Sequence, residues 1–300
     1  MQRSLSLRRY ISHLVIAFAA LTGLALAQQN SDQTTAHMIK LHSGISLNYV
    51  AQGDAHGPVI VLLHGAGDSW HSWQRVLPLL PSTYRVYAIT LRGHGLSDHP
   101  ETGYTRGDFA ADILDFLDQL DIQHATLVGH SLGSFVAQKV TEQDTGHHID
   151  RLVLIGSGPG TVKPSVRSVS SAFAGLQDPI PYTFARDFQA STIYRPIPAW
   201  FFETMVAEAQ RVTAATWHGL GTNVTTSNPL EDLEKIQIPT LLLWGEKDSI
   251  FHREDQDMLL KILPHASLKA YPETGHALHW EEPAKFTSDL LAFIRSHPSK

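Results

Sequence analysis

The sequence predicts an α/β protein whose mostly parallel sheet carries helices on both faces. Short apolar runs such as PVIVLLHG (58–65) and ATLVGH (125–130) indicate buried strands, and segments of helical periodicity alternate with them. The alternation stops after residue 160 and resumes at IPTLLLWGEKD (238–248). The chain of 300 residues is therefore expected to form a core from residues 38–160 and 236–300, with residues 161–235 inserted as a cap.

The strands are predicted from two patterns. Residues 38–53 alternate apolar and polar side chains around Ser43-Gly44, which is typical of a hairpin. Later strands are continuous apolar runs that lead into glycine-containing turns, as in the middle of a parallel sheet. These runs lie within segments 58–65, 85–95, 125–130, 151–160, 238–248 and 266–276.

The helices are predicted from apolar residues three and four positions apart. Residues 105–120 are typical, because Phe109, Ile113 and Phe116 share one face and acidic residues lie between them. Residues 72–80 have a helical tendency that Pro78 limits. Further helices are expected at 134–143, 253–263 and 282–296.

The first 27 residues have the features of a secretory signal peptide. Three arginines precede an apolar stretch, residues 14–27, which ends in an A-x-A sequence at Ala27. This stretch is shorter than the ~20 residues that a membrane-spanning helix needs. We therefore expect export to the periplasm or medium, a flexible segment at 28–37, and no stable membrane span after cleavage. Arg8-Arg9 leaves open a twin-arginine route instead of the general secretory route.

Charge and composition exclude several classes of partner and cofactor. Removing residues 1–27 takes away three arginines and no acid, which changes the formal net charge from −6 to −9. No basic cluster remains, so we expect no nucleic-acid partner. The chain has no cysteine and its 18 histidines are scattered without a metal-binding spacing, so we expect no metal and no cofactor. The sequence makes no prediction of the oligomeric state.

The stretch Gly129-His130-Ser131-Leu132-Gly133 fits the G-x-S-x-G pattern of a nucleophile elbow. It follows a predicted strand and opens a predicted helix, which is the structural context that this pattern requires. The two glycines permit a sharp reversal that exposes the hydroxyl of Ser131 at the edge of the sheet. Ser131 is therefore the predicted nucleophile.

A serine hydroxyl needs a base, and the base needs an acid to orient it. His276 follows the last predicted strand and is the predicted base, ahead of His279, which lies further along, and His265, which precedes that strand. Asp248 follows the preceding strand and is the predicted acid, ahead of Glu246. The order serine, aspartate, histidine along the chain is the order expected of such an elbow.

An oxyanion hole is expected where HGAGDSW (64–70) follows the first long buried strand. Glycines at 65 and 67 let the backbone approach a substrate, so the N–H of Ala66 is one predicted donor. The N–H of Leu132, at the start of the helix after the elbow, is the second.

Five motifs together resemble the α/β-hydrolase family over about residues 38–296. They are HGAG (64–67), RGHGLSD (92–98), GHSLG (129–133), WGEKD (244–248) and TGHALHWEEP (274–283). The resemblance implies an eight-stranded sheet, a helical cap inserted after the sixth strand, and the triad of Ser131, Asp248 and His276. It also implies that Arg92, His94 and Asp98 shape a structural turn. Dehalogenases and epoxide hydrolases of this family carry aspartate at the elbow, so Ser131 argues against both activities.

The predicted function is an exported serine hydrolase that cleaves an ester, a lactone or a related acyl bond of a small molecule. The aromatic cap is expected to roof the pocket, and Trp200, Phe201 and Trp217 are the candidate substrate contacts. The same triad also supports perhydrolase or haloperoxidase-like chemistry, carbon–carbon bond hydrolysis and hydroxynitrile cleavage. A ligand-binding receptor on the same fold is a further alternative.

Cleavage of the leader is testable on exported protein. Signal peptidase action after the A-x-A sequence should give a mature chain that begins at Gln28. Mass spectrometry of the N-terminal peptide measures this directly. An exported chain that still begins at Met1 would refute cleavage.

Overall fold

The computed structural model describes residues 35–160, 171–226 and 233–299 of the chain. The predicted signal peptide at 1–27 lies outside these ranges, and so do residues 28–34. Two parts of the predicted cap, residues 161–170 and 227–232, also lie outside them.

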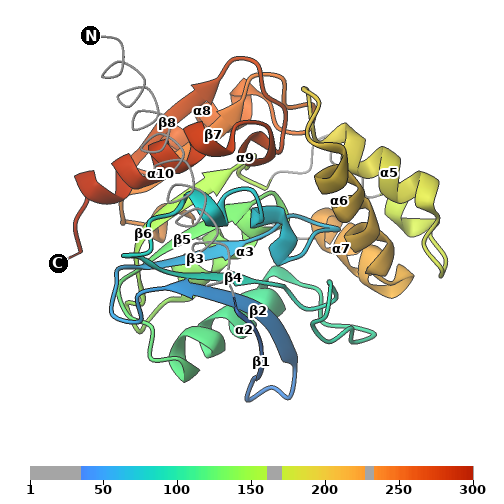
Figure 1. Ribbon diagram of the computed structural model, residues 1–300, viewed down its shortest axis with the longest axis horizontal. Coiled ribbons are helices and arrows are strands. Elements are labelled where there is room, and N and C mark those ends of the chain that lie inside the picture. Colours follow the sequence, from blue (N-terminus) through green and yellow to red (C-terminus); the bar gives the residue numbers. More distant parts are fainter. Residues whose placement is uncertain (1–34, 161–170, 227–232, 300) are drawn as a thin grey trace, which may run out of the picture. The chain divides into compact units, whose positions relative to one another are not determined.

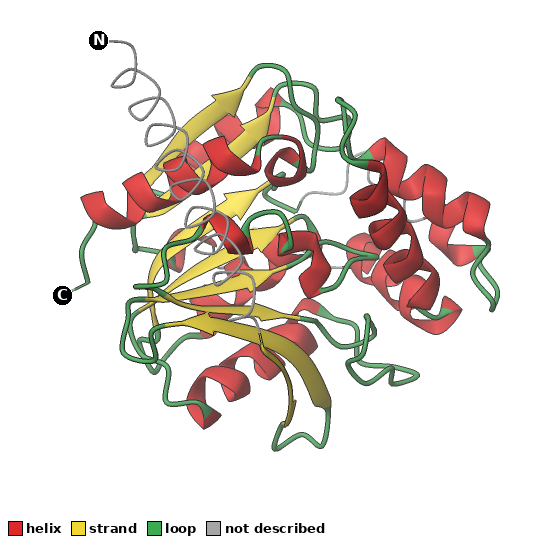
Figure 2. Cartoon of the chain, viewed as in Figure 1, coloured by secondary structure: helices red, strands yellow, loops and turns green. Residues whose placement is uncertain are grey.

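Within the described ranges, eight strands form one sheet in the order β1-β2-β4-β3-β5-β6-β7-β8 (Figures 1 and 2). Strand β2 runs antiparallel to β4, and every pair from β4 through β8 is parallel. The predicted mostly parallel, eight-stranded sheet is therefore confirmed. The strands are β1 (Thr35–Lys40), β2 (Ser46–Gly53), β3 (Val59–Leu63), β4 (Arg85–Ile89), β5 (Ala125–His130), β6 (Ile149–Ile155), β7 (Thr240–Gly245) and β8 (Ala266–Tyr271).

Strand β1 begins earlier than predicted. Its first residue is Thr35, so the last three residues of the segment predicted to be flexible, 28–37, belong to the sheet. Alternation identified the strand but not its start, because Thr35 pairs through backbone groups that any residue supplies.

Helices cover both faces of the sheet, and further helices lie between β6 and β7 along the chain (Figure 1). None of the helices in the described part of the chain has the length and hydrophobicity needed to cross a membrane. The Trp70–Leu79 region forms two short 3₁₀ turns rather than one helix, in keeping with Pro78. The helices are α2 (Arg106–Gln119), α3 (Leu132–Gln143), α5 (Tyr182–Ser191), α6 (Ala199–Arg211), α7 (Ala214–Thr226), α8 (Arg253–Ile262), α9 (Leu278–Glu281) and α10 (Pro283–Ser296).

Alternate residues of the central strands enter two separate hydrophobic cores. In β3, Val61 and Leu63 join the core that contains Phe109 of α2, whereas Ile60 and Leu62 join the core that contains Phe286 of α10. Strands buried on both faces need apolar side chains at every position, which explains the continuous apolar runs.

The register of the sheet aligns the carboxyl ends of its central strands. Leu63 of β3 pairs with Gly129 of β5, and His130 pairs with Ile155 of β6. Gly245 of β7 pairs with Tyr271 of β8 in the same way. The loops that follow these strands therefore emerge side by side at one edge of the sheet, where open α/β sheets bind ligands.

The RGHGLSD turn is held by buried polar contacts. Arg92 donates two hydrogen bonds of 2.6 Å to the carboxylate of Asp112 on α2. His94 contacts the carbonyl of Arg92 through Nδ1 at 2.9 Å, and Asp98 accepts the N–H of Ser46 at 2.7 Å. None of the three residues lines the cavity described below, which agrees with a structural role.

Replacing Arg92 by methionine should lower the free energy of unfolding by about 3–5 kcal/mol, because the buried carboxylate of Asp112 loses its cation. Equilibrium unfolding in urea measures the loss. The double variant R92M/D112L is the control and should recover part of the stability, since neither charge remains. A loss below about 1 kcal/mol in R92M would contradict a structural role for this ion pair.

Candidate active site

Ser131 lies in the strained turn between β5 and α3. Its backbone has φ 51° and ψ −115°, a region that residues other than glycine rarely occupy. A Cβ atom on Gly129 would lie 2.2 Å from the carbonyl oxygen of Gly133, and one on Gly133 would lie 2.5 Å from that of Leu63. The N–H of Ser131 donates to the carbonyl of Ile155 at 3.0 Å. The turn therefore forms only with both glycines, and the neighbouring strand fixes its position.

The loops after β7 and β8 bring Asp248 and His276 together. The Nδ1 atom of His276 lies 2.9 Å from Oδ2 of Asp248, and both side chains are buried. The other carboxylate oxygen, Oδ1, accepts the N–H groups of Ile250 and Phe251 at 2.8 and 3.1 Å. With the carboxylate ionised, Nδ1 carries the proton and Nε2 is left as an acceptor.

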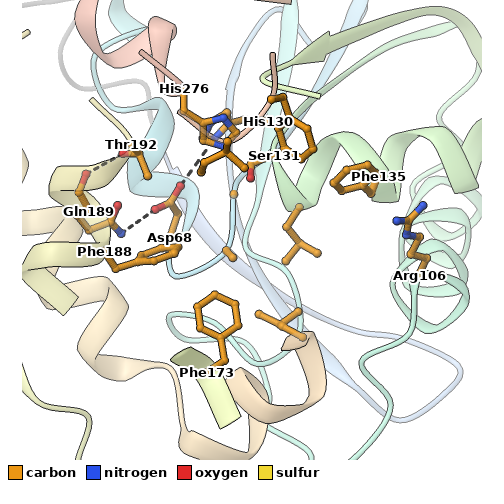
Figure 3. A pocket seen from close by; sticks show the side chains of 16 residues that line it. Asp68, Arg106, His130, Ser131, Phe135, Phe173, Phe188, Gln189, Thr192 and His276 are labelled. Carbon is orange, nitrogen blue, oxygen red and sulfur yellow. Dashed lines mark hydrogen bonds and ion pairs between the residues drawn. The ribbon is translucent and has the colours of Figure 1, made fainter. Parts of the chain in front are cut away.

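Ser131 and His276 line the same cavity (Figure 3). The Nε2 atom of His276 is buried and has no hydrogen-bond partner among the described residues. The three residues predicted from the sequence thus meet at one place: an oriented imidazole with a free acceptor, and a hydroxyl on a strained turn beside it. This arrangement can perform nucleophilic chemistry.

The rival candidates lie elsewhere. His279 is buried beside Ser72, with 3.3 Å between its Nε2 and the serine Oγ, and it does not line the cavity. His265 precedes β8, at the opposite edge of the sheet. Glu246 is exposed to solvent, whereas Asp248 is buried against His276.

The predicted oxyanion donors also face the cavity. Ala66 and Leu132 both line it, and no acceptor for either backbone N–H is found within the described ranges. His64 fixes the loop that carries Ala66: its Nε2 accepts the N–H of Leu91 at 3.0 Å, so its Nδ1–H donates to the carbonyl of Gly65 at 2.7 Å. The His64 carbonyl accepts the N–H of Gly133 at 3.0 Å, which ties this loop to the elbow.

The cavity has a volume of about 830 Å³, its open mouth included, and an apolar wall. Helices α5 and α7 of the cap contribute residues to the wall, and so does α3 of the core. The described cap residues that line it are Phe173, Phe188, Gln189, Thr192 and Leu220.

The three aromatic residues predicted as substrate contacts do not line the cavity. Trp200 is 57% exposed on the outer surface of α6. Phe201 is buried against Trp280, with 5.6 Å between the ring centroids. Trp217 is buried directly behind Gly67, where an added Cβ would lie 2.8 Å from the indole. Aromatic content indicated an apolar cap, but it could not indicate which face of each helix meets the core.

Asp68 is a buried carboxyl group in the cavity wall that sequence analysis did not single out. Its Oδ1 accepts a hydrogen bond of 3.0 Å from Gln189 of α5 (Figure 3), and its Oδ2 accepts one of 3.2 Å from Ser72. Burial raises the pKa of Asp68 to about 7, although the hydrogen bonds from Gln189, Ser72 and Gly65 oppose this shift. The sequence places this carboxyl directly after the predicted oxyanion loop, which could have drawn attention to it. Its burial could not be predicted, because it depends on the packing of α5 against the loop.

His130 fills the space between the other buried imidazoles. Its ring centroid lies 4.9 Å from that of His276 and 4.6 Å from that of His279. Burial, with the nearby His279 and His276, holds the pKa of His130 well below its usual range. Burial and His276 act in the same direction on the pKa of His279. Both rings are therefore neutral at physiological pH and add no positive charge beside His276. No group of three or more His, Asp or Glu side chains in the described ranges is arranged to hold a metal.

Comparison with known proteins identifies the family and the fold. The profile of the Alpha/beta hydrolase family matches residues 60–289, most of the chain. An uncharacterized protein of Mycobacterium tuberculosis is 29% identical over 261 residues, which cover 79% of this chain and 75% of that protein. A non-heme chloroperoxidase of Streptomyces lividans is 27% identical over 276 residues, 84% of this chain and 97% of the relative. The structure of an esterase from Exiguobacterium antarcticum superposes with a TM-score of 0.79 at 22% identity, covering 87% of this chain and all of the esterase.

The raised pKa of Asp68 predicts how the stability of the fold depends on pH. Folding raises this pKa from an ordinary value of 3.8 to about 7, so the folded state binds more protons between these pH values. Ionisation of Asp68 therefore lowers the free energy of unfolding progressively as the pH rises from about 4 to 7. Above pH 7 the full loss is on the order of 4 kcal/mol. Asp68→Asn keeps a neutral group there and should unfold at a higher temperature than the unmodified protein at pH 8, with a smaller difference at pH 5.

Thermal unfolding followed by circular dichroism at the two pH values measures this effect. The matched control is Asp121→Asn on the exposed surface, which should shift both temperatures equally. A D68N difference that is the same at pH 5 and pH 8 would contradict the raised pKa.

Proposed function

The chain belongs to the alpha/beta hydrolase family, and we propose that it is a serine hydrolase that cleaves esters, lactones or related acyl bonds of small molecules. One observation carries the proposal: His276, which is hydrogen-bonded to Asp248, lines the same cavity as Ser131 on its strained elbow. Such a group of three is the minimum that converts a serine hydroxyl into a nucleophile.

The first half of the proposed reaction forms an acyl-enzyme. His276 takes the proton of Ser131 through Nε2 as the serine oxygen attacks the substrate carbonyl carbon. The negative charge that develops on the carbonyl oxygen is stabilised by the N–H groups of Ala66 and Leu132, each such donor contributing roughly 3–4 kcal/mol. The imidazolium then gives its proton to the departing alcohol as the carbon–oxygen bond breaks.

The second half returns the free enzyme. A water molecule loses a proton to His276 and attacks the acyl carbon, and collapse of the intermediate releases the acid and reprotonates Ser131. Asp248 stays ionised throughout and stabilises the imidazolium of each step. Because Oδ1 of Asp248 is held by two backbone N–H groups, the imidazole keeps its orientation between steps.

Perhydrolysis is a second reaction that the same assay can measure. The relative from Streptomyces lividans is named a non-heme chloroperoxidase, and an acyl-enzyme can be attacked by hydrogen peroxide instead of water to give a peracid. Measuring acid and peracid from one ester in the presence of peroxide determines how the intermediate divides between the two nucleophiles.

Ser131→Ala should reduce kcat for a p-nitrophenyl ester by about 10⁴-fold or more, because no other group can form the acyl-enzyme. It should also abolish labelling by a fluorophosphonate, and the labelled peptide of the unmodified protein should contain Ser131. Ser82→Ala, at an exposed serine away from the cavity, is the matched control and should retain both activity and labelling. Labelling of the S131A protein at the normal rate would sink the proposal, and absence of labelling in the unmodified protein would favour a binding protein.

A further inference from the structure

The cavity contains a cation, Arg106, that makes no ion pair with any residue the structure describes. Arg106 is the first residue of α2, and its side chain lines the cavity (Figure 3). Its guanidinium carbon lies 4.4 Å from the centroid of the Phe135 ring, so the planar group rests on an aromatic face. Among the described lining residues, Arg106 is the only lysine or arginine.

No hydrogen bond or ion pair involves the Arg106 guanidinium within the described part of the chain. The carboxylate of Asp108, on the same helix turn, accepts the hydroxyl and the N–H of Thr105 in the capping box. Glu142 is near enough to raise the pKa of Arg106, but it pairs with Lys139 at 2.9 Å. The contrast is with Arg92, which is buried and makes two hydrogen bonds to one carboxylate, whereas Arg106 is partly exposed to the cavity.

This position is costly for a cation in two ways. Burial lowers the pKa of Arg106 to about 10, which reports the loss of hydration. The first turn of a helix also carries the positive end of the helix dipole, where a cation is disfavoured by about 0.3–1 kcal/mol. An anion that entered the cavity would offset both costs, and its charge would be favoured by the guanidinium and the helix end together.

We propose that Arg106 binds a carboxylate on the acyl part of the substrate, so that the preferred substrates are esters or lactones that carry a second, ionised acid group. This inference rests on the proposed function, because it places the scissile carbonyl at Ser131. A carboxylate matches the two-pronged donor geometry of a guanidinium. A single cation suits a singly charged group better than a phosphate dianion.

The arrangement of the cavity sets the orientation of such a substrate. Phe135 follows Ser131 by four residues on α3, about 6 Å along the helix axis, and Arg106 lies beyond Phe135. An aliphatic chain over Phe135 and Leu132 would therefore connect the carbonyl at the nucleophile to the carboxylate at the guanidinium. Asp68 lies on the other side of Ser131 in Figure 3, so the anionic end is attracted to one side of the cavity and repelled from the other.

The test compares two series of esters. One contains p-nitrophenyl monoesters of succinic, glutaric and adipic acid, whose acyl chains end in a carboxylate. The other contains neutral p-nitrophenyl esters with the same number of acyl carbons. We expect kcat/KM to favour the charged member of at least one pair, and Arg106→Met to reduce that preference at least ~10-fold by removing the charge while keeping the stem. Arg106→Lys should fall between the two, since it keeps the charge but loses the two-pronged geometry.

Within each pair, the ratio of kcat/KM for the charged ester to kcat/KM for the neutral ester is compared between variants. This ratio is unaffected by a loss of activity that altered packing causes equally for both esters. Arg186→Met, at an exposed arginine of α5, is the matched control and should leave the preference unchanged. A preference for the neutral ester in every pair, or a preference that R106M does not alter, would overturn the proposal.

A binding measurement separates this proposal from the proposed function. Isothermal titration of glutarate into S131A protein should show binding that is lost in S131A/R106M. If the unmodified protein hydrolyses neither series but this difference in binding is present, the carboxylate site stands and the hydrolase proposal fails. If the neutral esters are hydrolysed and glutarate binds both proteins equally, the hydrolase proposal stands and the carboxylate site is wrong.

Discussion

The close approach of Gly129 to Gly133 is the contact on which the rest of the site depends. A side chain at either position would overlap backbone atoms of the turn or of β3. Because the chain can reverse there, Ser131 leaves the sheet to line the cavity, and Leu132 starts helix α3 beside it. The same reversal places the N–H of Gly133 against the carbonyl of His64. One steric condition thus positions Ser131, the predicted nucleophile, and joins it to the loop that carries Ala66, one of the two predicted oxyanion donors.

The two imidazoles that flank His276 add no positive charge beside it. His130 and His279 are buried beside it with pKa values well below the usual range, so they remain neutral. Asp248 receives two backbone N–H groups on one oxygen and the imidazole on the other, which satisfies its charge without a lysine or arginine. The imidazoles of His130 and His279 therefore stay neutral while Asp68, whose pKa is raised, is the buried group beside them that holds a proton more readily than usual.

Much of the fold and the triad could be predicted from the sequence because both follow from local patterns. Continuous apolar runs identify strands buried on two faces, and residues directly after the carboxyl ends of neighbouring parallel strands must meet at one edge. Asp248 and His276 could be paired on that argument alone. The elbow could be identified because only glycine fits its two flanking positions.

The remaining features depend on packing between distant segments. The pKa of Asp68 is set by burial under Gln189, which lies 121 residues along the chain. The cap aromatics could be recognised as apolar, yet Trp217 turns to the core beneath Gly67 while Phe188 faces the cavity. Arg106 begins a helix whose apolar face was predicted, but nothing in the helix pattern indicates that its first residue reaches over Phe135.

Gln189 gives the cap a mechanical link to the chemistry. Its amide nitrogen lies 3.0 Å from Oδ1 of Asp68, 3.5 Å from the carbonyl of Gly67 and 3.3 Å from that of Met205 on α6. A displacement of α5 large enough to widen the cavity must stretch these contacts, and with them the loop that presents the N–H of Ala66. Opening of the cap is therefore coupled to the position of the loop that carries Ala66, the residue predicted to donate to an oxyanion.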